Sequence, residues 1–258
     1  MSRMASRVAR YSVSQNFLTS GALIRRLIRR AGIQNNDDVI EIGAGKGHIT
    51  RALAAASRSV RAYEIDPKLI ARLQASFDGA SNVAIVGGDF LHAKLPARGA
   101  YKVFSNIPFS ITTAIIKKLT NAINPPAEAW LVMERGAAMR LMGLPRESQL
   151  SLSVKPYFSI SIAHRFARAD FHPMPAVDAV LVRMTRRAQP DIAPCERGAY
   201  AAFIEKSLSR GLKHALTAPQ IRAALRAEGL GESGEMRYVQ WLCLFRCSRR
   251  LGGHRQKT

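Results

Sequence analysis

Short apolar runs alternate with amphipathic helical patterns over the first two thirds of the chain. Apolar residues recur at helical spacing within 20–31, which predicts a helix ahead of the first strand. The strands expected after it are 39–42, 60–66, 82–86, 101–105, 128–133, 158–166 and 179–184. The helices expected between them are 48–56, 67–78, 111–121, 134–142 and 147–155. This alternation predicts an α/β fold with an open sheet.

A proline-bearing link at 189–194 marks a change of pattern. The remainder carries four short helical patterns, at 196–207, 209–216, 219–228 and 236–247. We therefore expect a basic N-terminal tail at 1–13, a main α/β domain at 14–188 and a small, basic helical domain at 189–258.

Basic residues outnumber acidic ones by far. The chain has 258 residues, with 39 Lys and Arg against 18 Asp and Glu, and a formal net charge of +21. Such a field concentrates polyanions, so nucleic acid is the first partner to consider. No acid occurs within residues 1–30, where arginines cluster. The residues expected to contact the nucleic acid are Arg7, Arg10, Arg25, Arg26, Arg29, Arg30, Arg135 and Arg140.

The cysteine content indicates a reducing compartment. Cys195, Cys243 and Cys247 form neither a disulfide framework nor a zinc quartet, and we expect no metal site. No apolar run approaches membrane-spanning length, so a cytoplasmic protein without membrane contact is expected. The arginine- and serine-rich opening of the chain also resembles a transit peptide in composition, which is the alternative to a nucleic-acid-binding tail.

Three of the expected strands end in residues suited to a nucleoside ligand. The first ends in Gly43-Ala44-Gly45-Lys46-Gly47, a G-x-G-x-G turn whose backbone N–H groups open onto a helix. Glu64, at the end of the second, is placed to accept both hydroxyls of a ribose. Asp89 follows the third and is suited to an adenine amino group, with Phe90 as a wall; the alternative is an Asx turn. Asp66, before Pro67, is expected to cap the next helix.

The segment Ser105–Ile111 follows the fourth strand, at the edge where open α/β sheets bind ligands. Asn106 offers an amide oxygen, Pro108 lacks a backbone donor, and Phe109 adds a flat apolar ring. Acceptors beside a stacking platform suit the exocyclic amine of a nucleobase. The alternative is an ordinary turn that caps a helix. Phe171, in a later proline-braced loop, is expected on its own evidence to pack in the core.

Six motifs together are similar to those of the rRNA adenine N6-dimethyltransferases, over roughly residues 10–250. They occur in that family's order and at about its spacing. The motifs are S-Q-N-F-L at 14–18, E-I-G-A-G-K-G at 41–47, E-I-D-P at 64–67, G-D-F at 88–90, N-I-P-F at 106–109 and F-H-P-M-P-A-V at 171–177. Within that superfamily, N-I-P-F and the terminal Q-W-L-x-L-F at 240–245 resemble the erythromycin-resistance branch, which methylates 23S rRNA. One departure is Arg10-Tyr11, where the family often has Arg-His.

The resemblance implies a Rossmann-like class I methyltransferase sheet with a small C-terminal helical domain, and S-adenosylmethionine as the methyl donor. The expected reaction is methylation of the N6 amine of an adenine in the peptidyl-transferase loop of 23S rRNA, naked or before assembly, by a monomer. This reaction confers resistance to macrolides, lincosamides and streptogramin B. The implied catalytic residues are Asn106, Ile107, Pro108, Phe109 and Phe171. The implied cofactor-binding residues are Gln15, Asn16, Phe17, Glu41, Gly43, Ala44, Gly45, Gly47, Glu64, Ile65, Asp89, Phe90 and Asn106.

Other functions fit the motifs less well. A small-subunit (16S) rRNA dimethyltransferase of the same superfamily usually has N-L-P-Y at the tetrapeptide. A DNA adenine methyltransferase typically has N-P-P-Y or D-P-P-Y, and Ile107 argues against it. A non-catalytic nucleic-acid-binding protein on the same scaffold would not need the cofactor motifs intact. An NAD-dependent dehydrogenase requires G-x-G-x-x-G, which is absent.

Overall fold

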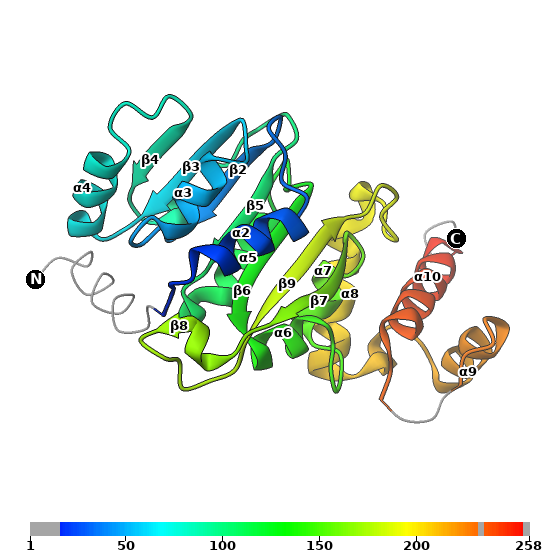
Figure 1. Cartoon of the computed structure of the whole chain (residues 1–258). Coiled ribbons are helices and arrows are strands. Elements are labelled where there is room, and N and C mark those ends of the chain that lie inside the picture. Colours follow the sequence, from blue (N-terminus) through cyan, green and yellow to red (C-terminus); the bar gives the residue numbers. More distant parts are fainter. Residues whose placement is uncertain (1–15, 232–234, 255–258) are drawn as a thin grey trace, which may run out of the picture. The chain divides into compact units, whose positions relative to one another are not determined.

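The chain forms two compact units. A computed structural model describes residues 16–231 and 235–254 (Figure 1). The first unit contains the chain through Ala138 together with Ile160–Arg186, and the second contains Met139–Ser159 and the chain from Arg187 onward. The segment 139–159 therefore belongs with the helical region, whereas we expected a single boundary near residue 188. The physical reason is that Leu152 lies in the hydrophobic core of the helical unit.

A seven-stranded sheet forms the centre of the first unit. Its order is β4-β3-β2-β5-β6-β9-β7, and β9 runs antiparallel to β6, while the pairs from β4 to β6 are parallel. The strands are β2 (Asp38–Ile42), β3 (Ser59–Glu64), β4 (Val83–Gly87), β5 (Lys102–Asn106), β6 (Glu128–Glu134), β7 (Phe158–Arg165) and β9 (Ala179–Arg186). The strand order reverses between β2 and β5, and ligands bind at such a switch point, outside the carboxyl ends of the strands.

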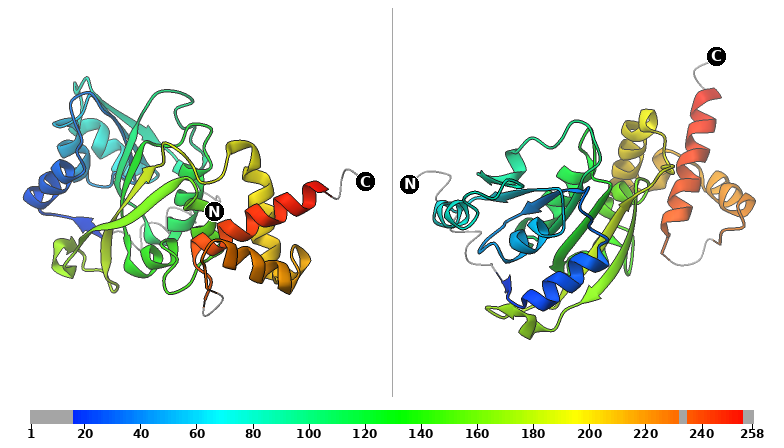
Figure 2. Two further views of the ribbon diagram at one scale, coloured as in Figure 1. Left: turned by 90° about the vertical axis from the view of Figure 1, so that its right-hand side faces the viewer. Right: turned by 45° about the horizontal axis from the view of Figure 1, so that its top comes forward.

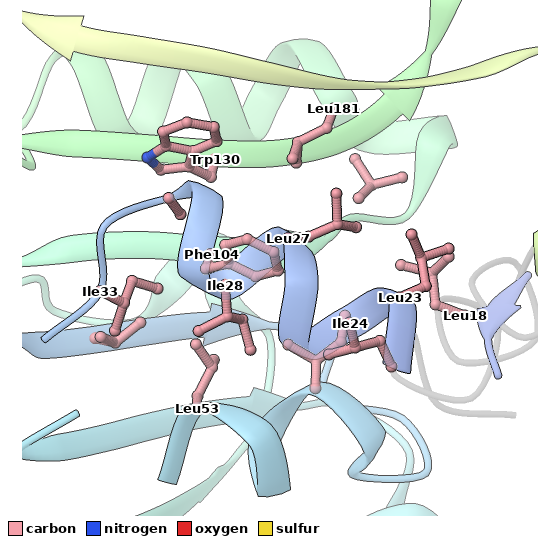
Figure 3. Close-up of a cluster of buried hydrophobic side chains, with 14 of the residues drawn as sticks. Leu18, Leu23, Ile24, Leu27, Ile28, Ile33, Leu53, Phe104, Trp130 and Leu181 are labelled. Carbon is pink, nitrogen blue, oxygen red and sulfur yellow. The ribbon is translucent and has the colours of Figure 1, made fainter. Parts of the chain in front are cut away.

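Helices cover both faces of this sheet (Figure 2). They are α2 (Gly21–Arg30), α3 (His48–Ala54), α4 (Pro67–Ser76), α5 (Thr112–Thr120) and α6 (Arg135–Leu141). The apolar stripe of α2 packs into one core cluster with Phe104 and Trp130 of the sheet. Figure 3 shows Leu27 and Ile28 on the side of α2 that faces these strands. The sheet face under α2 is thus sealed by a helix whose arginines remain outside.

The carboxyl ends of β2 and β5 are joined through one side chain. The backbone register pairs Val39 with Lys102 and Ile40 with Val103. Two residues further on, the Ser105 hydroxyl accepts from the Ile42 N–H at 3.2 Å and donates to the Ile42 carbonyl at 2.5 Å. Ser105 is fully buried, so this bridge satisfies both backbone groups of Ile42 without water.

A second, two-stranded sheet joins distant parts of the first unit. β1 (Phe17–Leu18) pairs antiparallel with β8 (Phe171–His172), and Phe17 lies opposite His172. No strand was predicted within the motif at 14–18 or within the proline-braced loop. Their pairing places the start of the described chain beside the carboxyl edge of the large sheet (Figure 1).

The second unit is helical, as the pattern after residue 189 predicts. Its helices are α7 (Gln149–Val154), α8 (Arg197–Arg210), α9 (Ala218–Ala227) and α10 (Tyr238–His254). Its core centres on the rings of Tyr200, Phe203 and Phe245. The Tyr200 ring packs edge-on against the Phe245 ring, and the Phe203 ring is tilted against it. The helix expected at 209–216 is wrong: Gly211 has φ +77° and ends α8, and only a short 3-10 turn follows, at Leu212–His214. In the described ranges, no helix is long and apolar enough to span a membrane.

Buried Glu41 links β2 to α3. Its carboxylate accepts from the Thr50 hydroxyl at 2.6 Å, and the side chain is almost fully enclosed. Burial raises the pKa of Glu41 to about 8; the hydrogen bond from Thr50 opposes this shift, and the neighbouring charge of Glu64 adds to it. The carboxyl is therefore neutral in the folded protein well above its ordinary titration range.

In the wild type we expect the free energy of unfolding to depend on pH through Glu41, and we expect the Glu41→Gln variant to lack this dependence. Between about pH 4.5 and about pH 8 the folded state binds a proton at Glu41 that the unfolded state has lost. The free energy of unfolding of the wild type therefore falls as pH rises through this window, and the neutral glutamine removes this contribution. Urea denaturation across the window measures the slope; Trp130 fluorescence in a Trp241→Phe background reports the sheet unit alone.

Glu128→Gln is the control. Burial opposes ionisation of Glu128, but hydrogen bonds from Arg183 and Trp130 lower its pKa. Glu128 is therefore ionised in both states across the same window, so its replacement leaves the slope unchanged. A slope that Glu41→Gln does not alter would contradict a protonated Glu41.

Candidate functional site

A cavity opens at the switch point between β2 and β5. Its lining consists of Asn16, Phe17, Gly43, Asn106, Ile107, Pro108 and Phe109. Every one of these residues was selected from the sequence as a cofactor-binding or catalytic residue. The fold thus brings together three motifs, at 14–18, 41–47 and 106–109, that lie far apart in the chain.

Asn106 has a defined orientation in this cavity. Its Nδ2 donates to the carbonyl oxygen of Asn16 at 2.6 Å, across 90 positions of sequence. Because the amide carries its donor and its acceptor on opposite branches, this bond fixes Oδ1 as the group presented on the other side. Ile107 is buried and donates its backbone N–H to Val132, so β6 holds the peptide that follows Asn106.

Phe17 lies against the glycine turn. A Cβ on Gly45 would stand 2.5 Å from Phe17 Cε1, and Gly45 has φ +59°. The close approach and the positive φ both require glycine here. Lys46 Nζ lies 4.9 Å from the centre of the Phe17 ring, which adds a cation–π contact. The turn is therefore covered by an aromatic ring from the N-terminal segment.

A second cavity adjoins the first through Gly43 and Pro108, which line both. Its wall comes from the ends of β2, β3 and β4 and from the turn before α5. The other lining residues are Ile42, Tyr63, Glu64, Ile65, Gly88, Asp89, Phe90 and Ile111. Together the two cavities run along the carboxyl edge of the sheet on both sides of Pro108.

Glu64 is held rigidly at the end of β3. One carboxylate oxygen accepts from Gly45 N at 2.8 Å, and the other accepts from Ile65 N at 2.8 Å and Asp66 N at 3.0 Å. These bonds tie the acidic strand end to the glycine turn of the neighbouring strand. A carboxylate oxygen accepts two hydrogen bonds, so capacity remains for a ligand hydroxyl. Asp66 caps α4 through Lys68 N at 2.8 Å, as expected.

Asp89 forms the Asx-type turn that the sequence left open as one alternative. Its Oδ1 accepts from Leu91 N at 2.8 Å, which is an Asx-type cap, and its Oδ2 lies 3.2 Å from His92 Nδ1. The residue also lines the second cavity. Phe90 is buried beside it, with its ring edge-on to Tyr63 at 5.2 Å. An acceptor next to a flat apolar wall suits a purine.

Several expected site residues lie behind the cavities rather than at their surface. Glu41 is buried with Thr50, and Gly47 begins α3 at φ +79°. Gly45 supports the site through its bond to Glu64, and Ala44 donates its N–H to the Tyr63 carbonyl at 3.0 Å. These four residues shape the turn and line neither of the two cavities, and their contact with a cofactor stays a prediction.

Phe171 is buried in the core, which differs from the position that the resemblance implies. The resemblance implies a second aromatic near the target base, but the ring is 3% exposed and packs edge-on against Phe166 at 5.2 Å. Pairing of β8 with β1 turns this side chain inward, and it lines neither cavity. The structure has the core packing that the loop alone predicts. Gln15, Arg7 and Arg10 lie outside the described residues.

The remaining expected RNA-contacting residues are exposed. Arg25, Arg26, Arg29 and Arg30 occupy the outer face of α2, opposite its buried stripe. Arg135 is exposed in the first unit, and Arg140 is exposed in the second. Among the described residues, the four α2 arginines take part in no ion pair. Their charge is therefore available to an anionic partner.

Sequence reasoning missed four residues of the second cavity. Ile42, Tyr63 and Gly88 each adjoin a residue that was selected, and Ile111 lies two positions beyond Phe109. A rule that includes the neighbours of each strand-end residue would have found the first three, because a strand end exposes its last side chains and the following turn to the same crevice.

Comparison with known proteins places the chain in one family. Residues 7–250 match the family described as ribosomal RNA adenine dimethylase. The rRNA adenine N-6-methyltransferase of Limosilactobacillus reuteri is 33% identical over 232 residues, which cover 90% of this chain and 93% of the relative.

Two solved structures have the same fold. The crystal structure of the 23S rRNA methyltransferase ErmE has a TM-score of 0.80 and 30% identity, and the match covers 91% of this chain and 100% of that one. A dimethyladenosine transferase from Plasmodium falciparum has a TM-score of 0.68 at 20% identity, with 86% of this chain and 85% of that one covered. With its cavities at the switch point and a family match along nearly its whole length, the chain belongs to the ribosomal RNA adenine dimethylase family.

Proposed function

We propose that this protein transfers methyl groups from S-adenosylmethionine to the N6 amine of one adenine in the peptidyl-transferase loop of 23S rRNA, and so confers resistance to macrolides, lincosamides and streptogramin B. Similarity to a 23S rRNA methyltransferase, at 30% identity over 91% of the chain, supports the choice of rRNA. We take the substrate to be naked or unassembled RNA and the enzyme to be a monomer. The observation that carries the proposal is the fixed Asn106 amide beside Phe109 in a cavity at the switch point.

The second cavity fits the nucleoside part of S-adenosylmethionine. Glu64 has one remaining acceptor position for a ribose hydroxyl, and Asp89 supplies an acceptor for the adenine amine beside the wall of Phe90. Gly43 lies between the two cavities with φ +74°, and a Cβ there would stand 3.6 Å from Pro108 Cδ. A side chain at this position would narrow the passage through which the methyl group must reach the base.

The first cavity fits the target adenine. The N6 lone pair of adenine is delocalised into the ring, so the amine is a poor nucleophile until it becomes pyramidal. Oδ1 of Asn106 and the Ile107 carbonyl would accept its two N–H groups and favour that geometry. Phe109 provides the stacking surface, and base–aromatic stacking contributes about 1–3 kcal/mol.

Alignment and electrostatics account for the rate. When bound, S-adenosylmethionine would supply an electrophilic methyl group; the S–CH3 bond would break as the N–CH3 bond forms, the thioether S-adenosylhomocysteine would leave, and the amine would lose one proton to solvent. Such a transfer requires no protein nucleophile. Asn106 and Ile107 orient the amine towards that methyl, and the enclosed crevice replaces solvent with fixed dipoles. The acceptor oxygens also stabilise the positive charge that develops on the nitrogen during transfer.

The outer face of α2 supports RNA binding. Its four arginines project from a helix whose other face is locked into the core, so they present a rigid row of charge. Burial, and then the charge of Arg26, lowers the pKa of His164 on the adjacent strand. Burial is the largest cause of this shift, so the support for RNA binding comes from the exposed arginines themselves.

The choice of 23S over 16S rRNA is tested by methyl transfer with tritiated S-adenosylmethionine. Purified protein is incubated separately with protein-free 23S and 16S rRNA, and we expect label in 23S alone, at a single adenine that primer extension locates. Label confined to 16S rRNA would contradict the substrate. Failure to bind S-adenosylmethionine by calorimetry would instead favour a non-catalytic RNA-binding protein.

Asn106→Ala is expected to slow methylation far more than it weakens cofactor binding. It removes an acceptor from the reacting amine and leaves Glu64 and Asp89 in place, so the single-turnover rate should fall by about a hundredfold. Calorimetry with S-adenosylmethionine should show affinity within a few-fold of the wild type. Unchanged turnover would exclude Asn106 from the mechanism.

Charge reversal on α2 is expected to weaken RNA binding and flatten its salt dependence. In the Arg26→Glu/Arg30→Glu variant two phosphate contacts are lost, and the slope of log K against log salt should fall by about two units. Lys68→Glu/Arg72→Glu makes the same change on the exposed side of α4 and serves as the control. Equal slopes for wild type and the α2 variant would show that this face does not touch RNA.

A further inference from the structure

The loop between β8 and β9 exposes apolar side chains. Met174 is 67% exposed and Val177 is 38% exposed, whereas Pro175 between them is buried. Pro173 and Ala176 are also exposed. Contiguous exposed apolar side chains mark interaction surfaces more often than single ones do.

One end of this loop begins at the first cavity. His172, which immediately precedes the loop, lies opposite Phe17 in the β1–β8 pair, and Phe17 lines the cavity that holds Asn106. Met174 is two residues further along the chain. The apolar loop therefore starts at the rim of the cavity assigned to the target base.

The other end returns to the same edge of the large sheet. The Asp178 carbonyl accepts from Arg135 N at 2.8 Å, and Ala179 pairs with Glu134 at the end of β6. On the opposite side of β6, Val132 pairs with Asn106. Both ends of the loop are thus fixed close to the catalytic tetrapeptide, and Figure 1 shows β8 at the edge where β6 ends.

Prolines and buried residues restrain the backbone of this loop. Pro173 and Pro175 each fix one backbone dihedral, and the buried Phe171 and Pro175 anchor the chain on both sides of Met174. The backbone around Met174 is therefore restrained, so little backbone entropy is lost when a partner binds there.

We propose that Met174 packs against the bases that flank the target adenine after the adenine has left its stack. This inference rests on the proposed function. A flipped base leaves apolar faces of its neighbours open to water, and proteins that unstack nucleic acids fill such gaps with side chains that include methionine. A thioether side chain is polarisable and adapts to a base face.

RNA is the partner that the surroundings of this loop favour. Arg135, at the end of β6, is exposed next to the point where the loop returns, and it supplies positive charge for a phosphate. An adenine that enters the first cavity must bring its neighbouring nucleotides to the rim. Met174 is the large apolar side chain two residues from that rim.

The test compares two RNA hairpins that carry the peptidyl-transferase loop adenine. In the closed hairpin the adenine is stacked within paired neighbours, and in the open hairpin an enlarged loop leaves it already unstacked. Met174→Ala should lower kcat/KM on the closed hairpin by about tenfold and on the open hairpin by less than about twofold. Met174→Leu, which keeps the apolar bulk, should restore activity on the closed hairpin.

Ile123→Ala is the matched control. Ile123 is 97% exposed, but it precedes the amino end of β6, whereas the cavities lie at the carboxyl ends of the strands. It should leave both rates unchanged. Equal losses on the two hairpins, or no loss on either, would overturn the role of Met174. In a separate readout, 2-aminopurine at the target position should brighten on binding to wild type and less on binding to Met174→Ala. If the wild type methylates neither hairpin, the proposed function fails, and the fluorescence still decides the role of Met174.

Discussion

Two hydrogen bonds between the Ser105 hydroxyl and the backbone of Ile42 hold the carboxyl ends of β2 and β5 next to each other, and the candidate site lies at these ends. At this point the backbone ladder between β2 and β5 has ended, yet the two strands must stay close enough for Gly43 and Asn106 to share a cavity. A single hydroxyl satisfies both the N–H and the carbonyl of Ile42. A buried backbone group without a partner is costly, so a larger or apolar residue at 105 would push the strand ends apart.

A second long-range link completes the cavity. The N-terminal segment reaches the sheet edge through β1–β8 pairing, and its Asn16 carbonyl then sets the direction of the Asn106 amide. The orientation of the Asn106 amide thus depends on a residue 90 positions away, and on a loop near residue 171 that pairs with the strand beside it. Neither contact belongs to the large sheet.

The sequence predicted what depends on local pattern. Strands such as 39–42 and 128–133 were within a residue or so of their observed ends, because buried parallel strands are short apolar runs bounded by turns. The strand-end residues Glu64, Asp89 and Asn106 were found for the same reason. Pattern alone does not reveal pairing between two-residue strands, so the β1–β8 pair was not predicted, although the loop alone predicts the core packing of Phe171. The helix expected at 209–216 failed because Gly211 adopts a left-handed φ.

Because 139–159 belongs to the helical unit, the polypeptide passes from one unit to the other three times. During synthesis α7 emerges before β7 and β9, which complete the sheet. Its core residue Leu152 packs with residues of α8 and α10, which are synthesised later. The first unit is therefore complete in sequence when β9 has been synthesised, at a time when α7 of the second unit is still without the helices that cover its core face.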